Sequence, residues 1–347
     1  MLPDVVGACL EDERHDGADG DGLQRTTGGL LVWRKATNTV AFTDGFRSWV
    51  QGPHGLQRRL NTERFDWEGG ALPSAAPAPG PAAPAHAGRT GPRSVLAGRR
   101  LLTYYGNPWA PQLGVLGELP KAELVRELRR VAGVYERFGG RPVQPAIHLI
   151  ATVAQAGPGP DGLYRARMPA AVVDEYARLA ADNGLLLILD VQVGRSTVRD
   201  EVAPYLPYLA RPDVHLALDP EFAVGPGERP GETLGGMDAR AVNEAVRTLA
   251  DLAASNDLPN KVLIVHQFAA SMLTNKAAIQ DDPRVDLVLD MDGFGGPAVK
   301  TRHYGLYVRD QAIEFAGIKL FYRHDHPLMA PEDVLGLDPA PDVVIYQ

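Results

Sequence analysis

Acidic and imidazole side chains follow apolar runs at several places after residue 100. These positions are Asp190 in LLLILD, Asp219 and Glu221 in VHLALDPE, His266 in VLIVHQ, and Asp290 and Asp292 in DLVLDMD. A buried strand that ends in an acid is costly unless the acid lies at the mouth of a sheet, where it faces solvent or a bound molecule. Carboxylates gathered at the carboxyl ends of parallel strands can perform acid and base chemistry. The pattern therefore predicts an active site at such an edge.

The alternation of side chains along a strand predicts which of these groups share a face. Asp190 and Gln192 share a face with Ile188, and Asp290 and Asp292 share a face with Val288. A bare apolar core does not tolerate such a cluster of charge. We therefore expect Asp190 to be a catalytic residue at the end of its strand.

Asp219 and Glu221 form the sharpest local pattern. Asp219 shares a face with His215 and Ala217, and Glu221 joins them if the strand continues past Pro220. The alternative is that Asp219 caps the following loop and that Glu221 is a solvated loop residue.

The Asp219-Pro220-Glu221 step resembles the Asp-x-Glu strand ending of glycosidases that cut amino-sugar polymers. The resemblance implies that Glu221 protonates the glycosidic oxygen and that Asp219 positions or stabilises a neighbouring group. It covers only this strand end and the repeating strand and helix pattern. Pro220 departs from that family, and its longer acidic signature does not occur here.

The LDMDGFGG segment supplies further candidates. Asp290 or Asp292 is expected to be the second carboxylate of a glycosidase pair, or to orient it, while Gly293, Gly295 and Gly296 would let backbone approach a ligand closely. The alternative is a glycine-rich turn that is capped by the aspartates.

Aromatic and amide side chains at the predicted strand ends are candidates for binding a sugar ring. YYGNPW, which contains Tyr105, Asn107 and Trp109, offers a stacking platform after the first strand of the large domain. The predicted substrate-binding residues are Tyr105, Asn107, Trp109, Gln192, His266, Gln267, Asp292, Tyr322 and Gln347.

The histidines point less clearly to one role. His266 could bind sugar, act as a base or ligate a metal, whereas His148 lies mid-strand and is expected to be a core residue. His324 and His326 resemble a metal pair, but no second His-x-His occurs, so we predict no metal and no cofactor. A metal-dependent lyase, isomerase or hydrolase stays open as an alternative. Its ligands would be Asp190, Asp219 or Glu221, His266 and Asp290.

Composition excludes several other classes of protein. The net charge of −8 and the pI near 5.6 argue against nucleic-acid binding, which requires clustered Lys and Arg. No apolar run approaches the roughly 20 residues that span a bilayer. Cys9 is the only cysteine, so no internal disulfide forms. No Gly-x-Ser-x-Gly elbow, phosphate loop or dinucleotide fingerprint occurs.

Eight strand patterns with helical patterns between most of them predict an α/β protein with a (β/α)8 TIM-type barrel. The predicted strands are 101–106, 146–153, 185–191, 214–219, 262–267, 286–291, 317–322 and 342–346. No helical pattern follows the last strand. We expect the gap beside it to be closed by the leading module, the linker or residues 94–100.

A small N-terminal β-rich module is predicted over 1–70, a Pro/Ala-rich linker over 71–97 and the barrel over 98–347. The segment LLVWRKATNTVAFTDGFRSWV predicts two strands around an ATN turn, followed by an Asp44-Gly45 turn. GPHGLQRRLNTERFDWE then predicts a turn and a short helix. Trp33, Trp49 and Trp67 are expected to form the module's core or, alternatively, to bind a glycan.

Together these patterns favour a glycoside hydrolase-like enzyme that acts on a polysaccharide or a cell-wall glycan. The chain also resembles uncharacterised exported bacterial barrel proteins that carry a leading FTDG…W…GL..RLN module, a likeness that names no activity. Its linker favours a secreted or cell-surface protein, although no signal peptide is visible after Met1. The alternative to catalysis is a non-catalytic glycan- or cell-wall-binding protein on a barrel scaffold. The oligomeric state stays open.

Overall fold

A closed barrel of eight parallel strands forms the larger unit of this computed structural model. The structure describes residues 6–15, 21–27, 29–43, 47–52, 55–60, 65, 93–311 and 314–347. The barrel strands are β7 (Arg100–Gly106), β8 (Val143–Ala154), β10 (Leu186–Val191), β11 (Val214–Leu218), β13 (Lys261–Gln267), β15 (Val285–Met291), β16 (Phe315–Leu320) and β17 (Val343–Tyr346). β17 pairs with β7 and so closes the barrel, which confirms the predicted TIM-type fold. Each of the eight predicted strands overlaps one of these.

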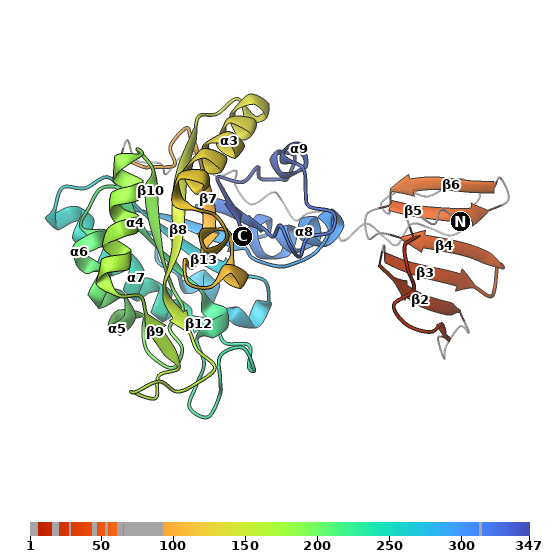
Figure 1. The fold of residues 1–347 in the computed structure, drawn as a ribbon, viewed down its shortest axis with the longest axis horizontal. Helices are drawn as coiled ribbons and strands as arrows, with labels where there is room; N and C mark the ends of the chain where they lie inside the picture. The colour runs from red at the N-terminus through yellow and green to blue at the C-terminus, as the bar shows by residue number, and fades with distance from the viewer. Residues whose placement is uncertain are drawn as a thin grey trace. The chain divides into compact units, whose positions relative to one another are not determined.

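Helices connect most of the strands. They are α2 (Val115–Glu118), α3 (Lys121–Gly139), α4 (Ala170–Asp182), α5 (Val198–Val202), α6 (Leu206–Leu209), α7 (Ala239–Ser255), α8 (Pro297–Tyr304) and α9 (Pro331–Leu335). Figure 1 shows α3 and α4 on the outside of the barrel, where α3 contacts β7 and β8, and α4 contacts β8 and β10. The β13–β15 connection has only η4 (Ala270–Met272), β14 (Leu273–Thr274) and η5 (Lys276–Ala278). β14 pairs with the short β12 (Met237–Asp238).

Side chains on the two faces of the barrel strands form two separate apolar clusters. Outward-facing residues such as Leu149, Leu189 and Leu216 pack in one cluster with residues of α3, α4 and α7. Inward-facing residues such as Ile188 and Ile264 form the other. The interior is polar toward the carboxyl ends of the strands, so alternation places the acids inside the barrel.

The amino-terminal end of the barrel is closed by residues that precede β7. Ser94 Oγ and the backbone N–H groups of Val95 and Leu96 donate to Asp286 Oδ2 at 2.8, 3.0 and 3.4 Å. Leu96 is buried in the interior cluster. Residues 93–97, which the sequence assigned to the linker, therefore take part in the barrel.

The outer face of the last strand is covered by helices of the barrel itself. Val344 and Tyr346 of β17 lie in the same apolar cluster as Tyr135 of α3 and Val334 of α9. The hydroxyl oxygens of Tyr346 and Tyr135 are 2.9 Å apart. Tyr135 of α3 thus packs on the outer face of β17, where the sequence predicted a gap, and α9 packs against α3.

The N-terminal unit is a six-stranded antiparallel sheet, in agreement with the predicted β-rich module. Its strands follow one another in chain order as β1 (Arg14–His15), β2 (Gly22–Thr26), β3 (Gly29–Arg34), β4 (Thr39–Thr43), β5 (Arg47–Gly52) and β6 (Gly55–Leu60). Asn38 has a φ of 51° in the ATN turn, and its Oδ1 accepts a hydrogen bond from Trp33 Nε1 at 3.1 Å. Buried Trp49 packs against Phe42, with ring centroids 5.6 Å apart. Trp49 therefore belongs to the core of this sheet.

One prediction for this unit is wrong. The sequence predicted a short helix after the turn at residues 52–55, but Gly55–Leu60 forms strand β6 and pairs with β5. Backbone pairing with a neighbouring strand overrides the helical preference of Leu, Gln and Arg, which is a weak local effect. Asp44, Gly45 and Trp67, and most of the predicted linker, lie outside the described residues. Within the described part of the chain, no helix combines the length and the hydropathy needed to span a membrane.

Candidate active site

A cavity of about 200 Å³ opens at the carboxyl ends of the barrel strands. Six of the predicted catalytic and substrate-binding residues line it: Tyr105, Gln192, Asp219, Glu221, Asp292 and Gln347. Its other walls are formed by four phenylalanines, Phe222, Phe268, Phe294 and Phe321, together with Leu113, Ile150, Gly293 and Lys319. Three carboxyl groups therefore face a small, largely apolar space in which charge is costly.

The pair of acids after β11 lies on a turn and not on a continued strand. β11 ends at Leu218, and Pro220 begins the 3-10 helix η3 (Pro220–Phe222), because proline has no N–H to continue a strand ladder. Glu221 still reaches the cavity. Burial and the charge of Asp292 raise its pKa to about 7. Burial and the nearby Glu221 raise the pKa of Asp219 well above its ordinary value.

Lys319 of β16 is a cavity residue that the sequence analysis missed. Its Nζ lies 3.1 Å from Asp292 Oδ2 and 3.6 Å from the centre of the Tyr105 ring. Burial alone would lower the pKa of this lysine, but the charges of Asp292 and Asp219 raise it above its ordinary value. The sequence does contain a pattern that marks this residue, because Lys319 is the one charged residue in the otherwise apolar GIKLF run.

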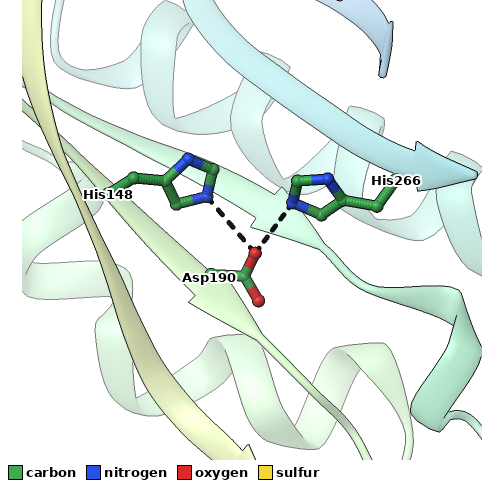
Figure 2. A group of neighbouring side chains, drawn as sticks. All are labelled: His148, Asp190 and His266. Atoms are coloured by element: carbon green, nitrogen blue, oxygen red, sulfur yellow. Dashed lines mark hydrogen bonds and ion pairs between the residues drawn. The ribbon is translucent and has the colours of Figure 1, made fainter. Parts of the chain in front are cut away.

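His148, Asp190 and His266 form a hydrogen-bonded group in the barrel interior (Figure 2). Asp190 Oδ2 lies 3.3 Å from Nε2 of His148 and 3.0 Å from Nε2 of His266. His266 Nδ1 lies 2.8 Å from Asp290 Oδ2 and 3.5 Å from Asp292 Oδ2. Asp190 and Asp290 are fully buried and are not among the residues that line the cavity. The predicted acids thus fall into two groups. One group lines the cavity, and the other, Asp190 and Asp290, is buried in the barrel interior.

The interior group has strongly shifted pKa values. Burial would raise the pKa of Asp190, but hydrogen bonds to His148 and His266 hold it below its ordinary range. Burial would lower the pKa of His266, but its bonds to Asp190 and Asp290 raise it well above its ordinary value. Burial lowers the pKa of His148 to about 4. His148 therefore belongs to a polar network and is not an isolated core residue.

Two sets of these side chains have the residue types and proximity to hold a metal ion. They are His148, Asp190 and His266, and His266, Asp290 and Asp292; within each set the ligand atoms lie within 4.8 Å of one another. His324 and His326, the pair noted in the sequence, are exposed and belong to neither set.

Five predicted substrate-binding residues do not line the cavity. One of them, His266, lies in the buried interior group with Asp190. Gln267 and Tyr322 directly follow the inward-facing His266 and Phe321, so alternation turns them outward. Gln267 donates to the carbonyl oxygen of Ala269 at 3.0 Å. The ring of Tyr322 stacks on that of Tyr346, with centroids 5.0 Å apart.

The other two follow β7. Asn107 is buried, and its Nδ2 donates to the carbonyl oxygen of Ile150 at 3.2 Å, so it holds the strand ends together. Trp109 is 64% exposed. Tyr105, in contrast, is only 2% exposed and lies in the interior cluster, so it both packs the barrel and lines the cavity.

The sequence matches no protein-family model, and no curated protein matches it as a relative. The geometry and the charges of the cavity therefore carry the functional assignment.

Proposed function

We propose that this protein is a glycoside hydrolase-like enzyme that cleaves a glycan by carboxylate acid/base catalysis. The observation that carries the proposal is Glu221, which lines a cavity at the carboxyl ends of barrel strands and has its pKa raised to about 7. A carboxylic acid that keeps its proton near neutral pH can donate it to the glycosidic oxygen of a leaving group. Glu221 is accordingly the general acid.

Asp292 is the partner carboxylate in this proposal. It lines the same cavity, whereas Asp290, the residue that the sequence also suggested, is fully buried against His266. Burial raises the pKa of Asp292, but the positive charges of Lys319 and His266 oppose that rise and favour its ionised form. A charged Asp292 would act as the nucleophile or base opposite Glu221.

Asp219 and Gln192 have supporting roles. Gln192 Nε2 lies 3.4 Å from Asp219 Oδ2, and Gln192 Oε1 accepts a hydrogen bond from the backbone N–H of Ala154 at 2.9 Å. These bonds anchor Asp219 beside Glu221, and the charge of Glu221 contributes to the raised pKa of Asp219. Mutual repulsion between the two acids favours keeping a proton on the pair.

The remaining walls suit a sugar ring. Tyr105 and four phenylalanines offer apolar faces, and the amides of Gln192 and Gln347 offer donors and acceptors for hydroxyl groups. The choice of a polysaccharide or cell-wall glycan, and a location outside the cell, are part of the same proposal. They rest on the proline- and alanine-rich segment of the sequence.

The proposal is tested by screening the full chain on a panel of polysaccharides and cell-wall glycans, with release of reducing ends as the readout. Glu221→Gln should keep the fold and glycan binding but lower turnover by roughly 100-fold or more, as expected for loss of acid catalysis. Glu232→Gln is the matched control, because this carboxylate lies in the loop after β11 but is exposed. Full activity of Glu221→Gln would contradict the assignment. Binding without cleavage by the wild type would favour the non-catalytic alternative.

A further inference from the structure

His148 and His266 direct the same ring nitrogen toward one carboxylate oxygen. They come from different strands, β8 and β13, and their Nε2 atoms both face Oδ2 of Asp190 on β10 (Figure 2). The two nitrogen-to-oxygen separations are 3.3 and 3.0 Å. Two ligands at about 2.0–2.1 Å from a zinc ion and at a tetrahedral angle are separated by roughly 3.3 Å. Both nitrogen-to-oxygen separations are thus close to those of ligands that share one ion, and all three atoms lie within 4.8 Å of one another.

The far nitrogen of each imidazole has a partner of its own. His266 Nδ1 lies 2.8 Å from Asp290 Oδ2, and His148 Nδ1 lies 3.4 Å from Thr103 Oγ1. Metal-binding histidines commonly donate their second N–H to a carboxylate or another oxygen, which fixes the tautomer and turns the other nitrogen toward the ion. Asp290 and Thr103 occupy these outer positions here.

The charges around this group favour a cation. With both imidazoles neutral, Asp190, Asp290 and Asp292 contribute −3 and Lys319 contributes +1, which leaves −2 in side chains at most 8% exposed. Protonation of His266 would remove only one of these charges. Within the described residues, Oδ1 of Asp190 and Oδ1 of Asp290 also have no hydrogen-bond partner. Buried charge that is not compensated is costly, and a divalent ion would neutralise it.

We propose that His148, Asp190 and His266 bind a divalent transition-metal ion, such as Zn²⁺, beneath the cavity. Two imidazoles and one carboxylate suit first-row transition metals, whereas Ca²⁺ and Mg²⁺ prefer oxygen ligands. The second set, His266, Asp290 and Asp292, is a poorer site, because Lys319 Nζ lies 3.1 Å from Asp292 Oδ2 and would repel the ion.

The site lies next to the cavity. The Tyr105 ring lines the cavity and packs against both imidazoles, with centroid distances of 4.9 Å to His148 and 6.0 Å to His266. A bound ion would hold Asp190 and both histidines in place below the carboxylates that face the cavity. Binding would release the protons on the two Nε2 atoms, so the affinity falls at acidic pH.

The experiment uses the full chain, which is stripped with a chelator, mixed with one equivalent of Zn²⁺ and then dialysed against metal-free buffer. We expect one ion per chain by elemental analysis and a higher melting temperature than for the stripped protein. His148→Gln and Asp190→Asn should abolish this stoichiometric binding. Asp290→Asn, which changes only an outer partner, should weaken it by roughly 10- to 100-fold. The double variant His324→Ala/His326→Ala is the control for adventitious binding by exposed histidines and should retain the ion.

Co²⁺ provides a second measurement that needs no variant. Its visible absorption in the wild-type protein should show a low-symmetry site with nitrogen and oxygen ligands, and Zn²⁺ should displace it. The proposal is overturned if the stripped, folded wild type retains no Zn²⁺ or Co²⁺ after dialysis. It is equally overturned if folded His148→Gln and Asp190→Asn retain the same stoichiometry. None of these readouts depends on glycan cleavage, so this site and the proposed activity can fail separately.

Discussion

Lys319 Nζ lies 3.1 Å from Asp292 Oδ2, and both residues line the same cavity. The lysine is buried, comes from β16 and lies above the Tyr105 ring. Because Lys319 opposes the effect of burial on Asp292, it controls how readily this carboxyl group ionises. The proposed nucleophile or base therefore depends on a cation from the neighbouring strand.

Replacing Lys319 with methionine should remove that control. Without the positive charge the pKa of Asp292 rises further, so the acid limb of the pH–activity profile moves to higher pH. Turnover near neutral pH should fall by roughly 100-fold, as for loss of one preorganised electrostatic group. Lys121→Met is the control, because the side chain of this lysine is 40% exposed, lies outside the cavity and pairs with Glu175 at 2.7 Å. An unchanged pH profile in Lys319→Met would remove Asp292 from the proposed mechanism.

The raised pKa of Glu221 should also appear in the pH dependence of stability. Its value rises from 4.5 to about 7 on folding, so the folded state holds this proton more tightly than the unfolded state. The contribution is present in full below pH 4.5 and is lost as the pH rises through about 7. Urea unfolding should show that the wild type loses more stability than Glu221→Gln between about pH 5 and pH 8. If the free energy of unfolding depends on pH in the same way in both proteins, folding does not raise the pKa of Glu221.

Gly317 should resist substitution because Asp290 lies against it. A Cβ at this position would be 2.8 Å from Asp290 Oδ1 and 3.1 Å from Asp290 Cα. Gly317→Ala should therefore cost about 1–3 kcal/mol in the free energy of unfolding. Gly133, inside α3, has nothing closer to its Cβ position than Arg137 at 3.8 Å. Gly133→Ala should instead stabilise by about 0.5–1 kcal/mol. Equal changes in the free energy of unfolding for the two variants would show that the barrel interior rearranges around Asp290 to accommodate the added methyl group.

The two aromatic residues of YYGNPW should separate into different roles. Trp109 is 64% exposed, so Trp109→Ala should change stability by less than about 0.5 kcal/mol. Tyr105 is 2% exposed, so Tyr105→Ala should cost about 3 kcal/mol or more. Thermal unfolding measures both. If Trp109→Ala keeps its stability but also binds glycan as tightly as the wild type, Trp109 is not a binding residue.

A chain that begins at residue 93 should melt at the same temperature as the barrel within the full chain. Tyr135 of α3 packs on the outer face of β17, and residues 94–96 close the amino-terminal end of the barrel. A chain that begins at residue 98 should melt lower, because Asp286 loses three hydrogen-bond donors. Calorimetry of the two truncated chains provides the comparison. Equal melting temperatures for both would show that residues 93–97 contribute nothing to stability.

The barrel itself could be predicted from the sequence, because strand and helix patterns are local. Apolar runs of period two and helical spacing located all eight strands, and alternation correctly placed Asp190, Asp219 and Asp290 on inward faces. The same alternation turns Lys319 toward the cavity and Gln267 and Tyr322 away from it.

Only the tertiary structure determines how deep each acid lies in the barrel and which side chains it contacts. Asp190 and Asp292 both face inward, yet only Asp292 reaches the cavity. How far a residue lies from the mouth depends on the stagger between neighbouring strands, which closure of the whole barrel determines. The contacts of His148 and His266 with Asp190 likewise join residues 42 and 76 positions apart. A local pattern reports only the direction of a side chain, because its period carries no information about the register of the strands beside it.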